Sequence, residues 1–341
     1  MRYVLSVDGG NTKTIALVAS LDGTILGTGR GGCGDIYNAR ANGKTPADAA
    51  IANIEHAVRG ALQSAQVAAS DVVASVFSMA GADWPEDFAL LRSAMEARGF
   101  GRTIVVQNDA LSVLHACSSG RSGVSVICGT GAATGARAPD GRTWHSSYWQ
   151  DQVQGGGHLG QKTLDAVYRS ELGIEPPTSL TPRVLAFFGL DTVEELLHRF
   201  TGRVRRPYDH IDHLTPILLD EAAAGDEVAR RIVREHGRAL GDYALAAARC
   251  VGIEGTPFAL VFAGGVFRHP SSLLADAIIE KVRVTSPEVR PMRSRFEPAI
   301  GVLFTALELA GAAIDEQLLA RLIPTIPVPA FFMTKPDMPG R

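Results

Sequence analysis

Two acidic residues lie at the ends of short apolar runs. A carboxylate at the end of a strand can reach a phosphate group bound by the following turn. Asp8 follows residues 3–7 and begins a glycine-rich turn, residues 8–14. Such a turn exposes a concave array of backbone N–H groups, which binds phosphate oxygens. A carboxylate beside phosphate requires a cation between them, and Mg²⁺ prefers oxygen ligands. The turn therefore predicts a phosphate site with a metal at Asp8. The alternative is an ordinary β-turn before a hairpin.

A second glycine-rich loop, Gly129, Thr130 and Gly131, follows the apolar run 124–128. Two such loops facing each other would clamp the β- and γ-phosphates of a nucleotide. Neither loop matches the Walker A pattern GxxxxGK[ST]. The glycines at 155–157 follow a polar stretch rather than a strand, which argues against a dinucleotide-binding fingerprint.

Asp109 is the third candidate, and it follows the predicted strand 103–107 after Asn108. Transfer of a phosphoryl group to an alcohol requires a base near the acceptor oxygen. We therefore expect Asp109 to be the catalytic carboxylate. The alternative is that Asp109 only caps a helix over residues 110–117.

The elements that must position these residues form a pattern that occurs twice. The repeated unit is a strand, a glycine-rich loop, a second strand, an Asp-Gly turn and a third strand. It begins near residue 3 and again near residue 124. A unit repeated about 120 residues apart predicts a duplicated domain. The apolar patterns predict strands at 3–7, 15–20, 24–29, 72–79, 103–107, 124–128, 132–138 and 258–263. They predict helices at 46–66, 88–98, 159–172, 181–188, 192–200, 214–223, 226–251 and 298–313.

Three segments follow from this pattern. We expect an N-terminal domain over residues 1–117, a second domain with helical insertions over 118–323, and a proline-rich strap or frayed tail over 324–341.

Composition narrows the classes of partner. The 341 residues are 46% hydrophobic and carry a formal net charge of −3 without a basic stripe, so we expect no nucleic-acid partner. No apolar run reaches the ~18–20 residues that span a bilayer, so we expect no membrane partner. The four cysteines, with no CxxC pair, predict free thiols in a reducing cytoplasm. They are Cys33, Cys117, Cys128 and Cys250.

As an ordered set, these motifs resemble the superfamily of acetate kinase, sugar kinases, heat-shock-70 proteins and actin. Within it, residues 2–315 look like the BadF/BadG/BcrA/BcrD ATPase group, which includes N-acetylglucosamine kinases. The resemblance is carried by residues 7–14, 107–110, 128–131, 139–141, 263–267 and 297–301. It implies an α/β fold of two duplicated actin-like (ribonuclease H-like) domains. Each would be a mixed five-stranded sheet with helices, and the two would flank a nucleotide cleft.

The resemblance also implies an ATP-dependent carbohydrate kinase, which transfers the γ-phosphate to a hydroxyl of N-acetylglucosamine, glucosamine or a related hexose. Asp8 would hold Mg²⁺ through water, and Asp109 would take the proton of the sugar hydroxyl. ATP would contact Gly9, Gly10, Asn11, Thr12, Lys13, Gly129, Thr130 and Gly131 with its phosphates, and Gly264 and Gly265 with its adenosine.

The acceptor side departs from the group's pattern. Asp35 stands where amino-sugar kinases of the group carry Asn, and Gln161 lies in a stretch where they carry an Asp. Asp35 favours a free amine, as in glucosamine, through charge pairing. The aromatic segment 143–151 suits a sugar, or it fills the core of a hairpin. We assign the acceptor to Asp35, Gly81, Asn108, Asp109, Trp149 and Gln161.

Two alternatives stay open. The same group contains ATPases that activate radical dehydratases through a cysteine-held iron–sulfur cluster, but the cysteine spacing offers no such pair. The other alternative is a non-catalytic sugar or nucleotide sensor. Repressors of this kind usually carry a DNA-binding helix-turn-helix before the first loop, and a first strand at residue 3 leaves no room for one. From the relatives we expect a homodimer through the second domain.

Overall fold

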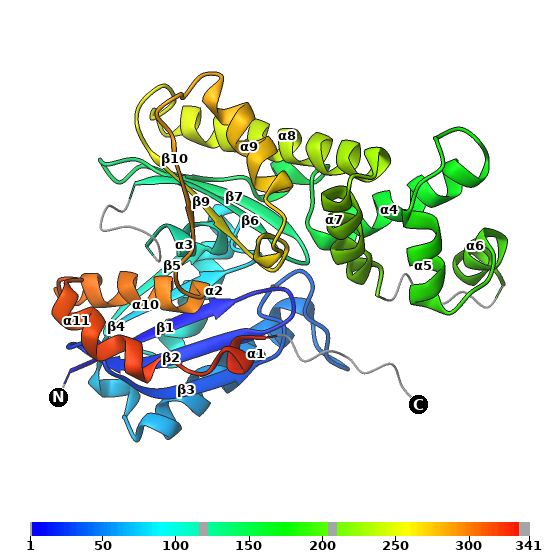
Figure 1. Ribbon diagram of the computed structural model, residues 1–341. Coiled ribbons are helices and arrows are strands. Elements are labelled where there is room, and N and C mark those ends of the chain that lie inside the picture. Colours follow the sequence, from blue (N-terminus) through cyan, green and yellow to red (C-terminus); the bar gives the residue numbers. More distant parts are fainter. Residues whose placement is uncertain (1, 116–121, 204–209, 334–341) are drawn as a thin grey trace. The chain divides into compact units, whose positions relative to one another are not determined.

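The computed structural model describes residues 2–115, 122–203 and 210–333 (Figure 1). Its contacts divide the chain into two units, Met1–Arg121 with Ser294–Arg341, and Ser122–Arg293. Cys117 and the end of the helix expected over 110–117 lie outside the described residues.

The first unit is built on a five-stranded mixed sheet in the order β3-β2-β1-β4-β5. Strands β1, β2 and β3 pair antiparallel, while β4 and β5 run parallel to β1. Their bounds are β1 Tyr3–Gly9, β2 Thr14–Ser20, β3 Ile25–Gly31, β4 Val72–Met79 and β5 Thr103–Asn108. Since Gly9 pairs with Met79 and Met79 with Asn108, β1, β4 and β5 end level at one edge of the sheet. The segments beginning at Asp8, Ala80 and Asp109 therefore meet there.

Alternation along the strands explains why helices cover both faces of this sheet. Leu5 and Val7 face a cluster with helix α1, whereas Val4 and Ile15 face a cluster with helix α10. The helices of this unit are α1 Pro46–Ala65, α2 Pro85–Ala97, α3 Ser112–His115, α10 Pro298–Leu309, α11 Glu316–Leu322 and α12 Pro329–Phe332. Its 3₁₀ turns are Ala69–Asp71, Asp109–Leu111 and Ile323–Thr325.

The placement of residues 294–323 differs from the predicted domain 118–323. Helix α10 packs on β1 and β4, and its Ile300, Leu303 and Leu307 are fully buried against that sheet. The residues that follow return to the same face, where Leu318 and Leu322 join the cluster. The apolar stripe of α10 therefore belongs to the first core, although the sequence reaches it only after the second domain.

The second unit repeats the strand order of the first. Its sheet runs β8-β7-β6-β9-β10, again with three antiparallel and two parallel strands. The strands are β6 Gly123–Cys128, β7 Ala132–Arg137, β8 Thr143–His145, β9 Ala259–Ala263 and β10 Arg290–Arg293. This order confirms the α/β fold of two duplicated five-stranded units.

Helices make up most of the rest of the second unit. They are α4 Gly156–Glu171, α5 Leu180–Phe188, α6 Val193–Thr201, α7 Leu214–Ala224, α8 Glu227–Cys250 and α9 Leu273–Arg283. Its 3₁₀ turns are Ser147–Gln150, Ile211–His213 and Val266–Arg268. Strand β10 and helices α9, α11 and α12 were not predicted individually. The four residues of β10 are mostly exposed and mostly charged or Pro, so they carry no apolar alternation.

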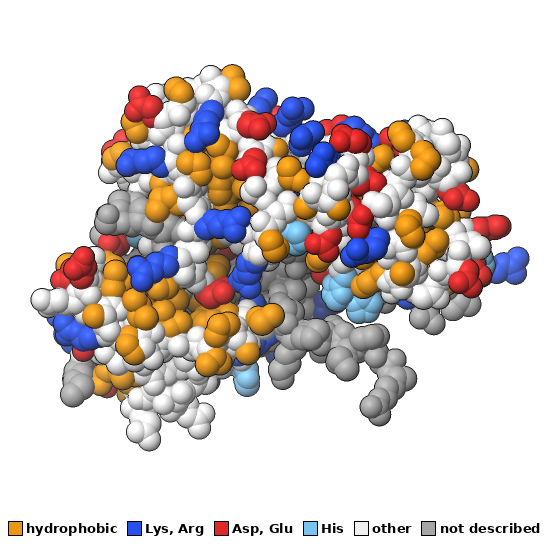
Figure 2. Space-filling view, in the orientation of Figure 1, with side chains coloured by type: hydrophobic (Ala, Val, Ile, Leu, Met, Phe, Trp, Pro, Cys, Tyr) orange, Lys and Arg blue, Asp and Glu red, His pale blue; other side chains and the backbone are white. Residues whose placement is uncertain are grey.

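The surface mixes both signs of charge. On the face in Figure 2, acidic and basic side chains are interspersed among the described residues, without a continuous basic stripe. Within the described ranges, no helix is both long enough and apolar enough to cross a bilayer.

Candidate active site

The first glycine-rich turn is held at the end of β1 by main-chain hydrogen bonds. Gly10 donates to Lys13 O at 2.9 Å, and Gly34 donates to Gly10 O at 3.0 Å. Ala80 donates to Gly9 O at 2.7 Å, which joins the turn to the end of β4. Asn11 and Thr12 lie exposed at its tip. The loop is therefore fixed at both ends and presents its tip to solvent.

Asp8 and Asp109 are the two carboxyl groups at this edge with strongly shifted pKa values. Burial raises the pKa of Asp8 to about 7, with Glu297 adding to the rise and Lys13 opposing it. Burial also raises the pKa of Asp109 to about 7, helped by the negative charges of Asp8 and then Asp83. The charge of Asp8 therefore acts on Asp109, and both groups are poised to exchange a proton near neutral pH.

Asn108, rather than Asp109, is the N-cap of the 3₁₀ turn that follows β5. The Asn108 Oδ1 accepts from the Ala110 N–H at 3.0 Å. Its Nδ2 donates to Ala82 O at 3.1 Å and to Asp83 Oδ1 at 3.0 Å. Asn108 thus binds the turn after β4 and leaves the 3₁₀ turn to begin at Asp109.

The donor set at this edge fits a metal shared with phosphate. Among the described residues, no group of three or more His, Cys, Asp or Glu side chains is arranged to hold a metal ion. Mg²⁺ commonly takes one or two protein carboxylates and completes its shell with water and phosphate oxygens. Asp8, a half-buried carboxyl group at the end of β1 beside the glycine-rich turn, fits this arrangement.

Asp35 and Gly81, both assigned to the acceptor, lie together near this edge. A Cβ built on Gly81, whose φ is +77°, would lie 2.6 Å from Asp35 Oδ1. Asp35 is 5% exposed, and its carboxylate accepts from the Tyr37 N–H and from Asn38 Nδ2, both at 2.8 Å. Local hydrogen bonds therefore already fix the orientation of Asp35.

Two aromatic residues beside Asp35 and Asp83 were not assigned from the sequence. The Tyr37 hydroxyl donates to Asp87 Oδ1 at 2.9 Å, and Asp87 Oδ2 accepts from the Trp84 N–H at 2.8 Å. Tyr37 and Trp84 remain 43% and 44% exposed. Tyr37 lies two residues after Asp35, and Trp84 directly follows Asp83. This closeness in sequence was the available signal, because half-exposed aromatic rings suit a sugar face.

The second glycine-rich loop is built against the start of α4. Gly129 donates to Gly131 O at 2.8 Å, and Gly156 donates to Gly129 O at 2.7 Å. A Cβ on Gly155 would lie 2.2 Å from Gly131 O, so only glycine fits there. The amino end of a helix attracts anions. The glycines at 155–157 therefore belong to this candidate phosphate site. From the sequence alone they had no assigned role and argued only against a dinucleotide-binding fingerprint.

Gly264 and Gly265 differ in their surroundings. Gly264 has a φ of +101°, and a Cβ there would lie 2.3 Å from Cys128 O at the end of β6. Nothing lies within 4 Å of a Cβ on Gly265. Gly264 is therefore required for close packing on β6, and Gly265 is the one with space for a ligand.

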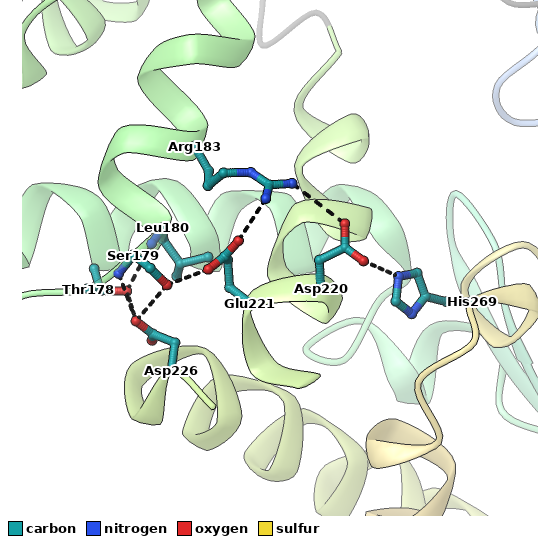
Figure 3. Close-up of polar contacts among 8 residues, drawn as sticks. All are labelled: Thr178, Ser179, Leu180, Arg183, Asp220, Glu221, Asp226 and His269. Atoms are coloured by element: carbon teal, nitrogen blue, oxygen red, sulfur yellow. Dashed lines mark hydrogen bonds and ion pairs between the residues drawn. The ribbon is translucent and has the colours of Figure 1, made fainter. Parts of the chain in front are cut away.

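A polar network fixes the loop that follows Gly265 (Figure 3). His269 Nδ1 accepts from the Ser271 N–H at 3.1 Å, so Nε2 carries the proton and donates to Asp220 Oδ1 at 3.1 Å. Arg183 bridges Asp220 at 3.7 Å and Glu221 at 3.1 Å. The loop is thereby tied to α7 and α5.

Trp149 and Gln161, the other acceptor candidates, lie in the second unit. Trp149 is 72% exposed, and Tyr148 before it is 51% exposed, whereas Trp144 packs against the core. The core alternative thus holds for Trp144 alone. Gln161 donates from Nε2 to Asp165 Oδ1, one turn along α4, at 3.0 Å.

A sequence profile of the BadF/BadG/BcrA/BcrD ATPase family matches residues 5–306. The chain belongs to this family. It is 26% identical over 310 residues to N-acetylmuramic acid/N-acetylglucosamine kinase of Clostridium acetobutylicum, covering 90% of this chain and 98% of the relative. It is 24% identical over 316 residues to N-acetyl-D-glucosamine kinase of Dictyostelium discoideum, covering 89% and 97%.

Solved structures show the same fold as this member of the BadF/BadG/BcrA/BcrD family. A candidate N-acetylglucosamine kinase of Chromobacterium violaceum superposes with a TM-score of 0.63 at 22% identity, covering 89% of this chain and 98% of that one. A glucokinase of Streptomyces griseus, solved with glucose and AMPPNP, superposes with a TM-score of 0.54 at 19% identity, covering 89% and 98%.

Two of the three cysteines described in this family member, Cys33 and Cys128, have surroundings that disfavour the thiolate, whereas Cys250 is exposed. Burial raises the pKa of the Cys128 thiol to about 12, and burial also raises that of Cys33. Iron–sulfur clusters bind thiolates, which such surroundings disfavour. Cys33 and Cys128 therefore give the iron–sulfur alternative no support.

Proposed function

We propose that this protein is an ATP-dependent carbohydrate kinase that transfers the γ-phosphate to a hydroxyl group of an amino sugar. The family match and two kinase relatives, each aligned along about nine tenths of the chain, support this activity. The observation that carries it is Asp109, a carboxyl group with a pKa of about 7 at the edge where β1, β4 and β5 end.

Asp109 is the proposed general base. A base works best when its pKa lies near the operating pH, because it is then largely deprotonated yet still basic. A pKa of about 7 meets this condition, whereas an ordinary aspartate at 3.8 is a much weaker base. Asp109 takes the proton of the attacking sugar hydroxyl as the oxygen forms its bond to the γ-phosphorus, and ADP leaves.

Main-chain N–H groups are the proposed ligands of the ATP phosphates. Each unit offers one candidate loop: the turn after Asp8 in the first unit, and the loop at Gly129–Gly131 beside the amino end of α4 in the second. Asp8 would hold Mg²⁺, which neutralises the charge that develops on the phosphates when it is bound. Asp8 would hold the cation as a carboxylate.

Asp35 directs the proposal toward amino sugars with a free amine. Its buried carboxylate lies beside Gly81 and is held by Tyr37 and Asn38. An ammonium group pairs with a carboxylate more strongly than an acetamido group does. We therefore expect glucosamine to be a better acceptor than N-acetylglucosamine.

An acceptor screen tests the activity. ATP consumption is measured with hexoses, amino sugars, acetylated amino sugars and small polyols, using wild type and Asp109→Asn. We expect turnover with an amino sugar, and a loss of at least about 10³-fold in kcat for the variant with ATP affinity retained. Absence of turnover with every acceptor would overturn the proposal, as would near-wild-type rates in the variant.

A homodimer and a cytoplasmic location remain predictions. Light scattering coupled to gel filtration measures the assembly state. Cell fractionation of the tagged full chain measures the location.

A further inference from the structure

The last described segment, residues 323–333, lies outside the residues matched by the family profile, which end at 306. We call it the C-terminal strap. It contains the 3₁₀ turn Ile323–Thr325 and the four-residue helix α12. Sequence patterns left open whether residues 324–341 form a strap or a frayed tail. Residues 323–333 contact the first unit as a strap, and residues 334–341 lie outside the described residues.

Both ends of the strap are anchored. Thr325 Oγ1 accepts from the Ile25 N–H at 3.0 Å, at the start of edge strand β3. Phe332 is only 3% exposed and joins the apolar cluster that contains Ile15 and Leu322. A buried phenylalanine contributes about 2–3 kcal/mol, so this end of the strap is firmly held.

Two basic side chains bind three consecutive carbonyl groups of the strap. Arg30 Nη1 donates to Phe331 O and Arg30 Nη2 donates to Met333 O, both at 2.8 Å. Lys13 Nζ donates to Phe332 O, between them. The last carbonyls of a helix lack intrahelical partners and carry partial negative charge, so cations there are stabilising.

These contacts reach the candidate phosphate site through Lys13. Lys13 belongs to the first glycine-rich turn, and its charge acts on the pKa of Asp8. A lysine side chain carries about 2 kcal/mol of rotamer entropy, so a fixed oxygen partner decides where its charge lies. Arg30 lies outside the turn. Its rigid guanidinium group fixes the carbonyl groups of Phe331 and Met333, which flank the carbonyl group that Lys13 binds.

The geometry points to Arg30 as a positioning residue for ATP: it holds the strap so that Phe332 O fixes Lys13 in the phosphate turn. This rests on the proposed function only in taking ATP as the ligand of the turn. Arg30 acts on nucleotide affinity and leaves recognition of the acceptor unchanged. The competing explanation is that the strap only stabilises the first unit.

Arg30→Gln separates these explanations. Affinities for ATP and ADP are measured by calorimetry without an acceptor, beside KM for the acceptor and the melting temperature. We expect nucleotide affinity to fall about 3- to 10-fold, the loss of roughly one charge-assisted hydrogen bond, with acceptor KM within about twofold. The nucleotide affinity of Arg30→Lys should lie between those of wild type and Arg30→Gln, because one ammonium group cannot bridge two carbonyl groups as the guanidinium does.

Arg59→Gln is the matched control. Arg59 is exposed on α1 of the same unit and pairs with Glu55, away from the turn and the strap. The control should keep wild-type nucleotide affinity. Hydrogen exchange of residues 9–14 should accelerate in Arg30→Gln and stay unchanged in the control.

Three results would overturn this assignment. They are a lower melting temperature in Arg30→Gln with unchanged nucleotide affinity, unchanged exchange of residues 9–14, and a wild type that binds no ATP. A wild type that phosphorylates no sugar but binds ATP in an Arg30-dependent way removes the proposed function and leaves this inference standing.

Discussion

At the scale of single residues, Asp8 and Asp109 store unfavourable free energy in the ligand-free protein. Both have an ordinary pKa of 3.8 and a folded-state pKa of about 7. Between these values the folded chain keeps protons that the unfolded chain has lost. The free energy of unfolding therefore falls as pH rises from about 4 to 7 and stays low above that.

The first prediction concerns this pH dependence. The ligand-free protein should be about 1–3 kcal/mol less stable at pH 8 than at pH 5.5, since one pKa unit corresponds to about 1.4 kcal/mol and the charge of Asp8 contributes to the raised pKa of Asp109. Asp109→Asn should flatten the profile and be more stable than wild type at pH 8. Urea unfolding at several pH values measures this. Glu96→Gln, at an exposed position of α2, should follow the wild-type profile; a wild type that gains stability toward pH 8 would contradict the burial of both groups.

The second prediction concerns acceptor choice at Asp35. Asp35→Asn keeps the shape and the bond from the Tyr37 N–H but removes the negative charge. The ratio of kcat/KM for N-acetylglucosamine over glucosamine should rise about tenfold, equivalent to roughly 1.4 kcal/mol of charge pairing. Coupled assays with both sugars measure the ratio. An unchanged ratio in a variant with wild-type melting temperature would show that Asp35 does not face the amine.

At the scale of elements, the junction between the second glycine-rich loop and α4 depends on one missing side chain. Gly155→Ala would place a methyl group 2.2 Å and 2.3 Å from two carbonyl oxygens, so the loop or the helix must shift. We expect about a tenfold or greater loss of ATP affinity and a stability loss of about 1–3 kcal/mol. Calorimetry and urea unfolding measure both.

Gly157→Ala is the matched control for that variant. A Cβ on Gly157 meets its nearest neighbour, Thr130 O, at 3.9 Å, an ordinary contact. Alanine also favours the helix by up to about 1 kcal/mol over glycine. The control should be as stable as wild type or more so. Equal effects of the two substitutions would mean that the close approach at Gly155 does not matter.

At the scale of the whole molecule, the first unit is assembled from two separate parts of the chain. Ile300, Val302, Leu303, Phe304 and Leu307 of α10 are all nearly or fully buried against the first sheet. Five such side chains contribute about 8–15 kcal/mol, which matches the entire stability of a typical domain.

The fourth prediction follows from this assembly. Residues 1–121 alone should fail to fold cooperatively, because one face of the sheet would be exposed to water. The same residues joined by a flexible linker to 294–341 should fold. Circular dichroism during heating and binding of an apolar dye measure the difference. A cooperative transition in the shorter fragment would contradict the role of α10.

Sequence patterns alone determined much of the nucleotide side of this protein. The apolar runs, the two glycine-rich loops and the Asp-Gly turns are local features, so they predicted the duplicated sheets and the strand-end positions of Asp8 and Asp109. Their ordered set also carried the family resemblance that the profile confirms. Period-2 alternation and turn chemistry act within a few residues, which is why they can be read without a structure.

Only tertiary structure decided which distant segments complete each unit. The return of α10 to the first core and the contact of Gly155 with the second loop depend on partners far along the chain or on atomic close approach. The same is true of Arg30 and the strap, about 300 residues apart in sequence. An apolar pattern shows that one face of an element must be buried, but it does not show which other element packs against that face. Packing and hydrogen bonding between those segments supply the answer.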